Sequence, residues 1–106
     1  MAEKGNNSGT KWTFLTNHAH VLLCIAEKPD LRMRDLAQIV GITERAVQKI
    51  VADLAEGGYL DVEKGGRCNT YKTNTEKHLR HPIESQHQVA DLLRLIGSIQ
   101  DRNTSE

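Results

Sequence analysis

The stretch that decides the fold is RDLAQIVGITERAVQKIVADLAE, residues 34–56. Apolar side chains recur in it at spacings of three and four residues, on both sides of the tight turn Gly41-Ile42-Thr43. This spacing is typical of amphipathic helices, which bury one stripe of side chains and leave the opposite stripe free. We therefore predict two helices joined by a turn. The expected buried positions are Leu36, Ala37 and Val40 in the first helix, and Val47, Ile50, Val51 and Leu54 in the second.

The free stripe of the second predicted helix is polar. Its members are Glu44, Arg45, Gln48, Lys49 and Ala52. The stripe carries two cations and an amide, and the small side chain at its last position leaves room for close approach. Because no bulky apolar group stands on this face, it suits a helix that lies in a DNA groove.

The two helices and their turn resemble the helix-turn-helix of bacterial and archaeal transcription regulators. The matching positions are Ala37, Gly41, Ile42, Val47 and Ile50. A small residue at position 37 lets the helices cross closely, and Gly41 can take the left-handed conformation that ends a helix. Thr43 can then cap the following helix.

A further helix is expected before this motif. Thr16 or Asn17 is a suitable cap, and the apolar residues that follow extend the helix to about Glu27. Residues 28–30 end it, because proline disfavours helical geometry in the residue before it. Residues 31–33 are predicted to form a short connection to the motif.

A β-hairpin is expected after the motif. Residues 59–63 and 70–74 alternate apolar and polar side chains, and the residues between them are rich in turn formers. The order of three helices and a hairpin resembles that of the winged helix-turn-helix regulators of the MarR and ArsR superfamily, over residues 16 to about 74. The resemblance implies a mainly α fold with a small β-hairpin (α+β), to which this chain adds a C-terminal helix.

The added helix is predicted to open at His81-Pro82, since proline is tolerated in the first helical turn. Related small regulators usually dimerise through terminal helices, and paired DNA half-sites require a twofold protein. We therefore expect the apolar stripe of this helix to form a dimer seam, the alternative being that it completes the core against the first helix. The seam residues are expected to be Val89, Leu92, Leu93, Ile96 and Ile99.

The chain is long enough for one domain. The predicted organisation is a disordered arm at residues 1–11, a winged helix-turn-helix DNA-binding domain at 12–80, a C-terminal dimerisation helix at 81–100 and a disordered tail at 101–106. No signal peptide or spanning segment stands out, which predicts a cytoplasmic protein without a membrane partner.

DNA contacts are expected from three places, although the formal net charge is zero. The second helix of the motif would place side chains against base edges and phosphates in the major groove. The entry to the first helix of the motif would contact phosphates, and the hairpin would reach the minor groove or the backbone. The expected contacts are Arg32, Arg34, Thr43, Glu44, Arg45, Gln48, Lys49, Lys64, Arg67, Asn69 and Lys72.

No catalytic group, cofactor or metal site is predicted. His18 and His20 are two residues apart, so a helix would direct them to different faces. The three later histidines have no cysteine pair or carboxylate at a metal-ligand spacing, and the DNA-reading helix lacks the cysteine-rich motif that the resemblance would imply for a metal sensor. A thiol switch at Cys68 and a small-molecule effector both stay open.

The expected function is that of a homodimeric prokaryotic transcriptional regulator that binds double-stranded DNA sequence-specifically. The alternative is a winged-helix protein-interaction module or accessory subunit, which the zero net charge favours. An enzyme is not expected, because no nucleophile–base pair, paired carboxylates or phosphate-binding loop stands out.

Overall fold

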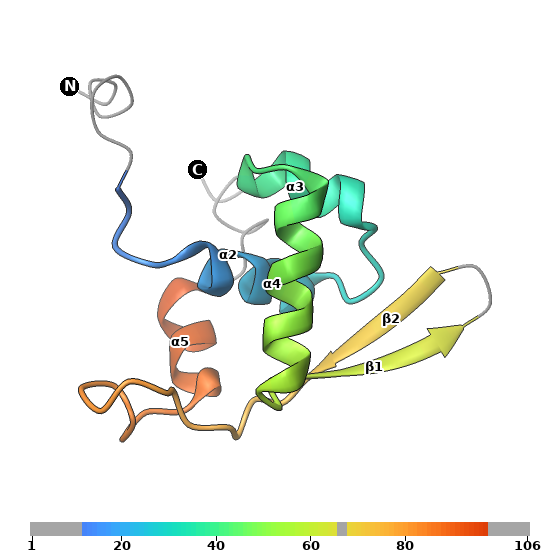
Figure 1. Ribbon diagram of the computed structural model, residues 1–106. Helices are drawn as coiled ribbons and strands as arrows, with labels where there is room; N and C mark the ends of the chain where they lie inside the picture. The colour runs from blue at the N-terminus through green and yellow to red at the C-terminus, as the bar shows by residue number, and fades with distance from the viewer. Residues whose placement is uncertain (1–11, 66–67, 98–106) are drawn as a thin grey trace.

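The computed structural model describes residues 12–65 and 68–97. Within these ranges three helices are followed by a hairpin and a last helix (Figure 1). The elements are α2 (Asn17–Glu27), α3 (Met33–Val40), α4 (Glu44–Glu56), β1 (Leu60–Gly65), β2 (Cys68–Thr73) and α5 (Val89–Ile96). This order confirms the predicted α+β winged helix with an added helix. The predicted arm at residues 1–11 and tail at 101–106 lie outside the described residues.

The ends of the helices follow the local signals in the sequence. The hydroxyl oxygen of Thr16 accepts a backbone hydrogen bond of 3.2 Å at the start of α2, which ends at Glu27 as predicted. Gly41 ends α3 in the left-handed conformation, with φ of 87°. The Thr43 hydroxyl caps α4 by accepting a hydrogen bond of 3.0 Å from the backbone N–H of Ala46. The predicted start of α3 was one residue late, since the helix begins at Met33.

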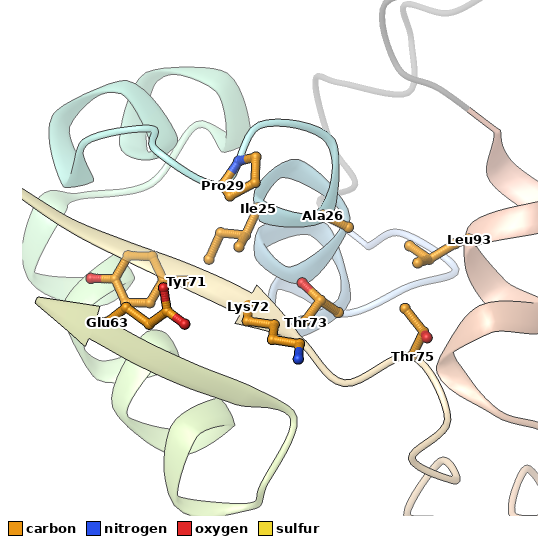
Figure 2. A pocket seen from close by; sticks show the side chains of 9 residues that line it. All are labelled: Ile25, Ala26, Pro29, Glu63, Tyr71, Lys72, Thr73, Thr75 and Leu93. Carbon is orange, nitrogen blue, oxygen red and sulfur yellow. The ribbon is translucent and has the colours of Figure 1, made fainter. Parts of the chain in front are cut away.

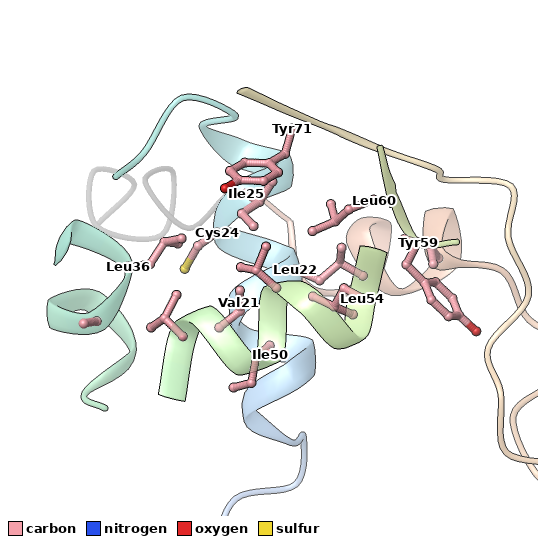
Figure 3. Packing of buried hydrophobic residues seen from close by; sticks show 14 residues of the cluster. Val21, Leu22, Cys24, Ile25, Leu36, Ile50, Leu54, Tyr59, Leu60 and Tyr71 are labelled. Carbon is pink, nitrogen blue, oxygen red and sulfur yellow. The ribbon is translucent and has the colours of Figure 1, made fainter. Parts of the chain in front are cut away.

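The core lies between α2, α3, α4 and the base of the hairpin, and it also includes Val89 of α5 (Figure 3). Its members from the helices include Val21, Leu22, Cys24 and Ile25 of α2, Leu36 and Ala37 of α3, and Val47, Ile50, Val51 and Leu54 of α4. Tyr59, Leu60 and Tyr71 close it from the hairpin side. The stripe predicted for α4 is therefore its buried face, and the opposite stripe stays exposed.

The last helix begins at Val89, so its predicted start at His81-Pro82 was wrong. Residues 82–86 form turns instead. Ile83 is 81% exposed, and the segment has no apolar stripe that a helix could bury. The carboxylate of Asp91 fixes the true start by accepting a hydrogen bond of 2.9 Å from the backbone N–H of Gln88.

The segment before α5 is a closed loop. His78 and Gln88 pair as an antiparallel bridge, and the backbone N–H of Val89 donates to the carbonyl of Lys77 at 2.9 Å. The Tyr59 hydroxyl donates to the carbonyl of His78 at 2.7 Å, which attaches the loop to the connection between α4 and β1.

None of the described helices has the length and apolar character that crossing a bilayer requires.

Candidate DNA-binding surface

The outward face of α4 carries the strongest candidates. Arg45 and Gln48 are exposed, and their side chains form no hydrogen bond or ion pair with another described residue. With Ala52 they lie within about 60° of one another around the helix axis, at 3.6 residues per turn. The arrangement thus offers a guanidinium and an amide beside a small residue, on a helix whose opposite stripe is fixed in the core.

Lys49 differs from its neighbours because it is paired. Its ammonium group lies 3.2 Å from Oδ1 of Asp53, one turn further along α4. The other oxygen of this carboxylate, Oδ2, lies 2.9 Å from Nε2 of His18 on α2. The His18 hydrogen bond, followed by that of Lys49, lowers the pKa of the Asp53 carboxyl below its usual range. This contact was not predicted from the sequence, because His18 and Asp53 are 35 positions apart and belong to different helices.

The start of α4 has mixed electrostatics. The Thr43 hydroxyl oxygen is occupied as a cap, but its O–H proton remains for an acceptor. Glu44 is exposed in the first turn, where the helix dipole favours a negative charge. A phosphate at this helix start would therefore meet a carboxylate as well as free amides. Arg32 and Arg34, at the start of α3, are both exposed.

The strand register divides the predicted hairpin contacts between two faces. Lys64 pairs directly with Asn69, so the two side chains share a face. Lys72 pairs with Asp61 in the strand register, so these two side chains share the opposite face. Arg67, the expected tip contact, lies outside the described residues.

Some of the candidate seam residues on α5 are buried in the monomer, and others are partly exposed. Val89 is 0% exposed and belongs to the core of the monomer, so it is not available to a partner. Leu93 packs against the same core. Leu92 is partly exposed, and Leu95, which was not among the predicted seam residues, is 79% exposed. Ile96 is likewise partly exposed, whereas Ile99 lies outside the described residues.

A shallow, open hollow of about 400 Å³ lies between α2, β2 and α5 (Figure 2). Its lining residues are Ile25, Ala26, Pro29, Glu63, Tyr71, Lys72, Thr73, Thr75 and Leu93. The side contributed by the helices is apolar, and the side contributed by the hairpin is largely polar. The buried hydroxyl oxygen of Thr73 has no hydrogen-bond partner among the described residues.

The histidines that follow the hairpin make separate contacts. Nδ1 of His78 lies 2.7 Å from the carbonyl of Ser85, and Nδ1 of His87 lies 3.5 Å from the Asp91 carboxylate. Nδ1 of His81 accepts a backbone hydrogen bond of 3.1 Å. Within residues 12–65 and 68–97, no three His, Cys, Asp or Glu side chains are grouped as metal ligands.

Comparison with known proteins identifies relatives of this arrangement. The model of the MarR family matches residues 12–67, which is more than half of the chain and includes α2, α3, α4 and β1. A search of curated proteins gives no match.

Two solved structures are similar to the chain. The PcaV transcriptional regulator from Streptomyces coelicolor, solved with its natural ligand, has a TM-score of 0.51 and 20% identity over 92% of this chain and 72% of PcaV. AdcR, a zinc-dependent MarR family transcriptional regulator solved with Zn(II), has a TM-score of 0.46 and 25% identity over 61% of this chain. The match spans about half of AdcR, 47% of its length. The PcaV likeness agrees with the winged-helix fold, and the extent of the family match shows that this chain belongs to the MarR family.

Proposed function

We propose that the chain is a transcriptional regulator that binds double-stranded DNA sequence-specifically as a homodimer. In this proposal α4 enters the major groove and the hairpin contacts the minor groove or the backbone. The observation that carries it is that Arg45 and Gln48, beside Ala52 on α4, are exposed and have no side-chain partner among the described residues. A regulator of this kind works where the chromosome is, so we expect a cytoplasmic location and no enzymatic activity.

The side chains of α4 have distinct chemical roles in this proposal. An arginine guanidinium suits the two acceptors of guanine, and a glutamine amide suits the donor and acceptor of adenine. Ala52 leaves the space that base edges need for close approach. Arg32, Arg34 and the Lys64–Asn69 pair would hold phosphates, which position the protein without reading the sequence.

A homodimer would bring two copies of α4 to one operator. The outward flank of α5 supports this arrangement, because Leu95 is largely exposed and Leu92 lies beside it one turn earlier. A twofold protein presents its reading helices to half-sites about one DNA turn apart, roughly 34–36 Å. The operator should accordingly be a near-palindrome.

Selection of bound duplexes from a random library with the purified protein tests this proposal. We expect an enriched inverted repeat, and a scrambled duplex of the same composition serves as the control. Affinity for the enriched duplex should fall with salt at a log–log slope of roughly −0.9 for each neutralised phosphate. No enrichment and no measurable affinity for any duplex at low salt would exclude DNA binding.

A protein-interaction module is the second candidate function, and zero net charge favours it. Such a module would present the same exposed α4 face to a protein surface. The duplex titration separates the two candidates, because a module without phosphate contacts gives neither a salt slope nor a preferred sequence.

A further inference from the structure

The bridge between α2 and α4 is built on a single carboxylate. The two oxygens of Asp53 lie 3.2 and 3.5 Å from the Lys49 ammonium group, and Oδ2 also lies 2.9 Å from Nε2 of His18. A cation on the candidate DNA-binding helix and a titratable imidazole on another helix therefore share one counter-ion. The side chain of Lys49 is 75% exposed, so it is free to leave the carboxylate.

Two charged partners, His18 and Lys49, act on the Asp53 carboxylate. Besides α2, the elements packed most extensively against α4 are α3 and β1, and neither brings a charged group that shifts the pKa of Asp53. The other histidine of α2, His20, contacts the side chain of Asn17 at 3.2 Å. The net charge of the bridge is thus zero when His18 is neutral and +1 when it is protonated.

We propose that His18 and Asp53 position Lys49 and make its contact with DNA sensitive to pH. When His18 is neutral, Lys49 is the only cation paired with Asp53 among the described residues, and it is held on the flank of α4 next to α2. When His18 takes a proton from solvent, its imidazolium neutralises the carboxylate and frees Lys49 for a phosphate. This inference rests on the proposed DNA-binding function, and it makes His18 a positioning residue that acts through Asp53.

The expected effect follows from the number of phosphates neutralised. One additional lysine–phosphate contact steepens the salt slope by about 0.9 per protomer. Between 50 and 200 mM salt, a slope change of that size alters the affinity ratio about 3.5-fold per protomer. Histidine ordinarily changes charge between about pH 5 and 8. Duplex binding should therefore be tighter and more salt-dependent at pH 6 than at pH 8.

Duplex titrations at both pH values with three variants test the proposal. The change His18→Gln keeps a hydrogen-bond donor without a titrating charge, and Lys49→Gln removes the group that is released. The control is His20→Gln, on the same helix, because the described hydrogen-bond partner of the His20 ring is Asn17 of α2 and not a residue of α4. The wild type and the control should show the extra slope at pH 6, and the other two variants should not. Retention of the pH-dependent slope in either His18→Gln or Lys49→Gln would overturn the proposal.

A measurement without DNA separates this proposal from the proposed function. Nuclear magnetic resonance shifts of the Lys49 side chain should follow the titration of His18 in the free wild-type protein. The coupling should disappear in His18→Gln and in Asp53→Asn, with thermal melting used to confirm that each variant is folded. Uncoupled shifts would refute the positioning of Lys49 whatever the DNA result. Coupled shifts without duplex affinity would instead refute the proposed function and leave the positioning intact.

Discussion

Replacing the glycine in the turn of the helix-turn-helix should lower the free energy of unfolding by an amount that can be estimated from the structure. Gly41 has φ of 87° and ψ of 34°, and its backbone N–H donates to the carbonyl of Ala37 at 2.8 Å. A Cβ added at Gly41 would meet no atom within 4 Å, so Gly41→Ala introduces backbone strain without a clash. The left-handed conformation costs an alanine about 1–2 kcal/mol. Lower entropy of the unfolded chain offsets about 0.4–1 kcal/mol of that cost.

The net loss in the free energy of unfolding should therefore be about 1 kcal/mol, which lowers the Tm of a domain of this size by about 4–8 °C. Thermal and urea unfolding of Gly41→Ala measure it. Gly41→Asn is the matched control, because asparagine tolerates the left-handed region and should retain more stability. An alanine variant as stable as the wild type would refute the reasoning, as would an asparagine variant no better than alanine.

The remaining predictions concern DNA reading, assembly and pH. Gln48→Ala should weaken binding to the selected operator by about 1–3 kcal/mol and leave the affinity for random duplex unchanged, because it removes an amide and no charge; equal losses on both duplexes would contradict base reading. Leu95→Asp should produce a folded monomer in sedimentation analysis, and a dimer that survives would place the seam elsewhere. The pKa of Asp91 is lowered from its ordinary value of 3.8, chiefly by the backbone hydrogen bond from Gln88. The ionised carboxylate of Asp91 therefore stabilises the fold at pH values above 3.8, and this stabilisation is lost as the pH falls through the lowered pKa of the folded state. Asp91→Asn should accordingly lower Tm at pH 7 and have little effect at pH 2 to 3, whereas an equal loss at both would contradict a charge effect.

The helices of the motif could be predicted because their ends are specified by short-range chemistry. Thr43 accepts a hydrogen bond from a backbone N–H three residues ahead, and Gly41 provides a backbone conformation that other residues disfavour. The three- and four-residue spacing of apolar side chains likewise identifies the buried face of α4. These signals act within one or two turns, so neighbouring residues suffice to recognise them.

The start of α5 was mispredicted because two local signals compete there. Pro82 is compatible with a first helical turn, but it is equally compatible with the turns that occupy residues 82–86. Asp91 lies three residues after Gln88 and fixes the helix start at Val89 by accepting the hydrogen bond from the Gln88 backbone, but in the sequence it resembles any other acidic residue. A helix that begins at Val89 has the better packing, because the side chain of Val89 is fully buried.

The exposed residues of the candidate site could be predicted from the sequence, but the contacts that some of them make with other elements could not. Arg45 and Gln48 follow from helical periodicity, because a helix with one buried stripe must expose the other. The bridge from Lys49 through Asp53 to His18 depends on how α2 crosses α4. The strand register similarly decides that Lys72 lies opposite Asp61. Such contacts depend on tertiary geometry, which the spacing of residues within one element does not reveal.

The closed loop before α5 has a consequence for how chains of this type can vary and be engineered. Since His78 and Gln88 are paired across its base, the chain leaves the winged helix and returns to it at nearly the same point. Residues 80–87, between those two positions, are exposed. Extra residues inserted after Ile83 would lengthen the loop without displacing either end. The loop is therefore a natural place for a peptide epitope or a fluorescent label, and α5 would keep its position.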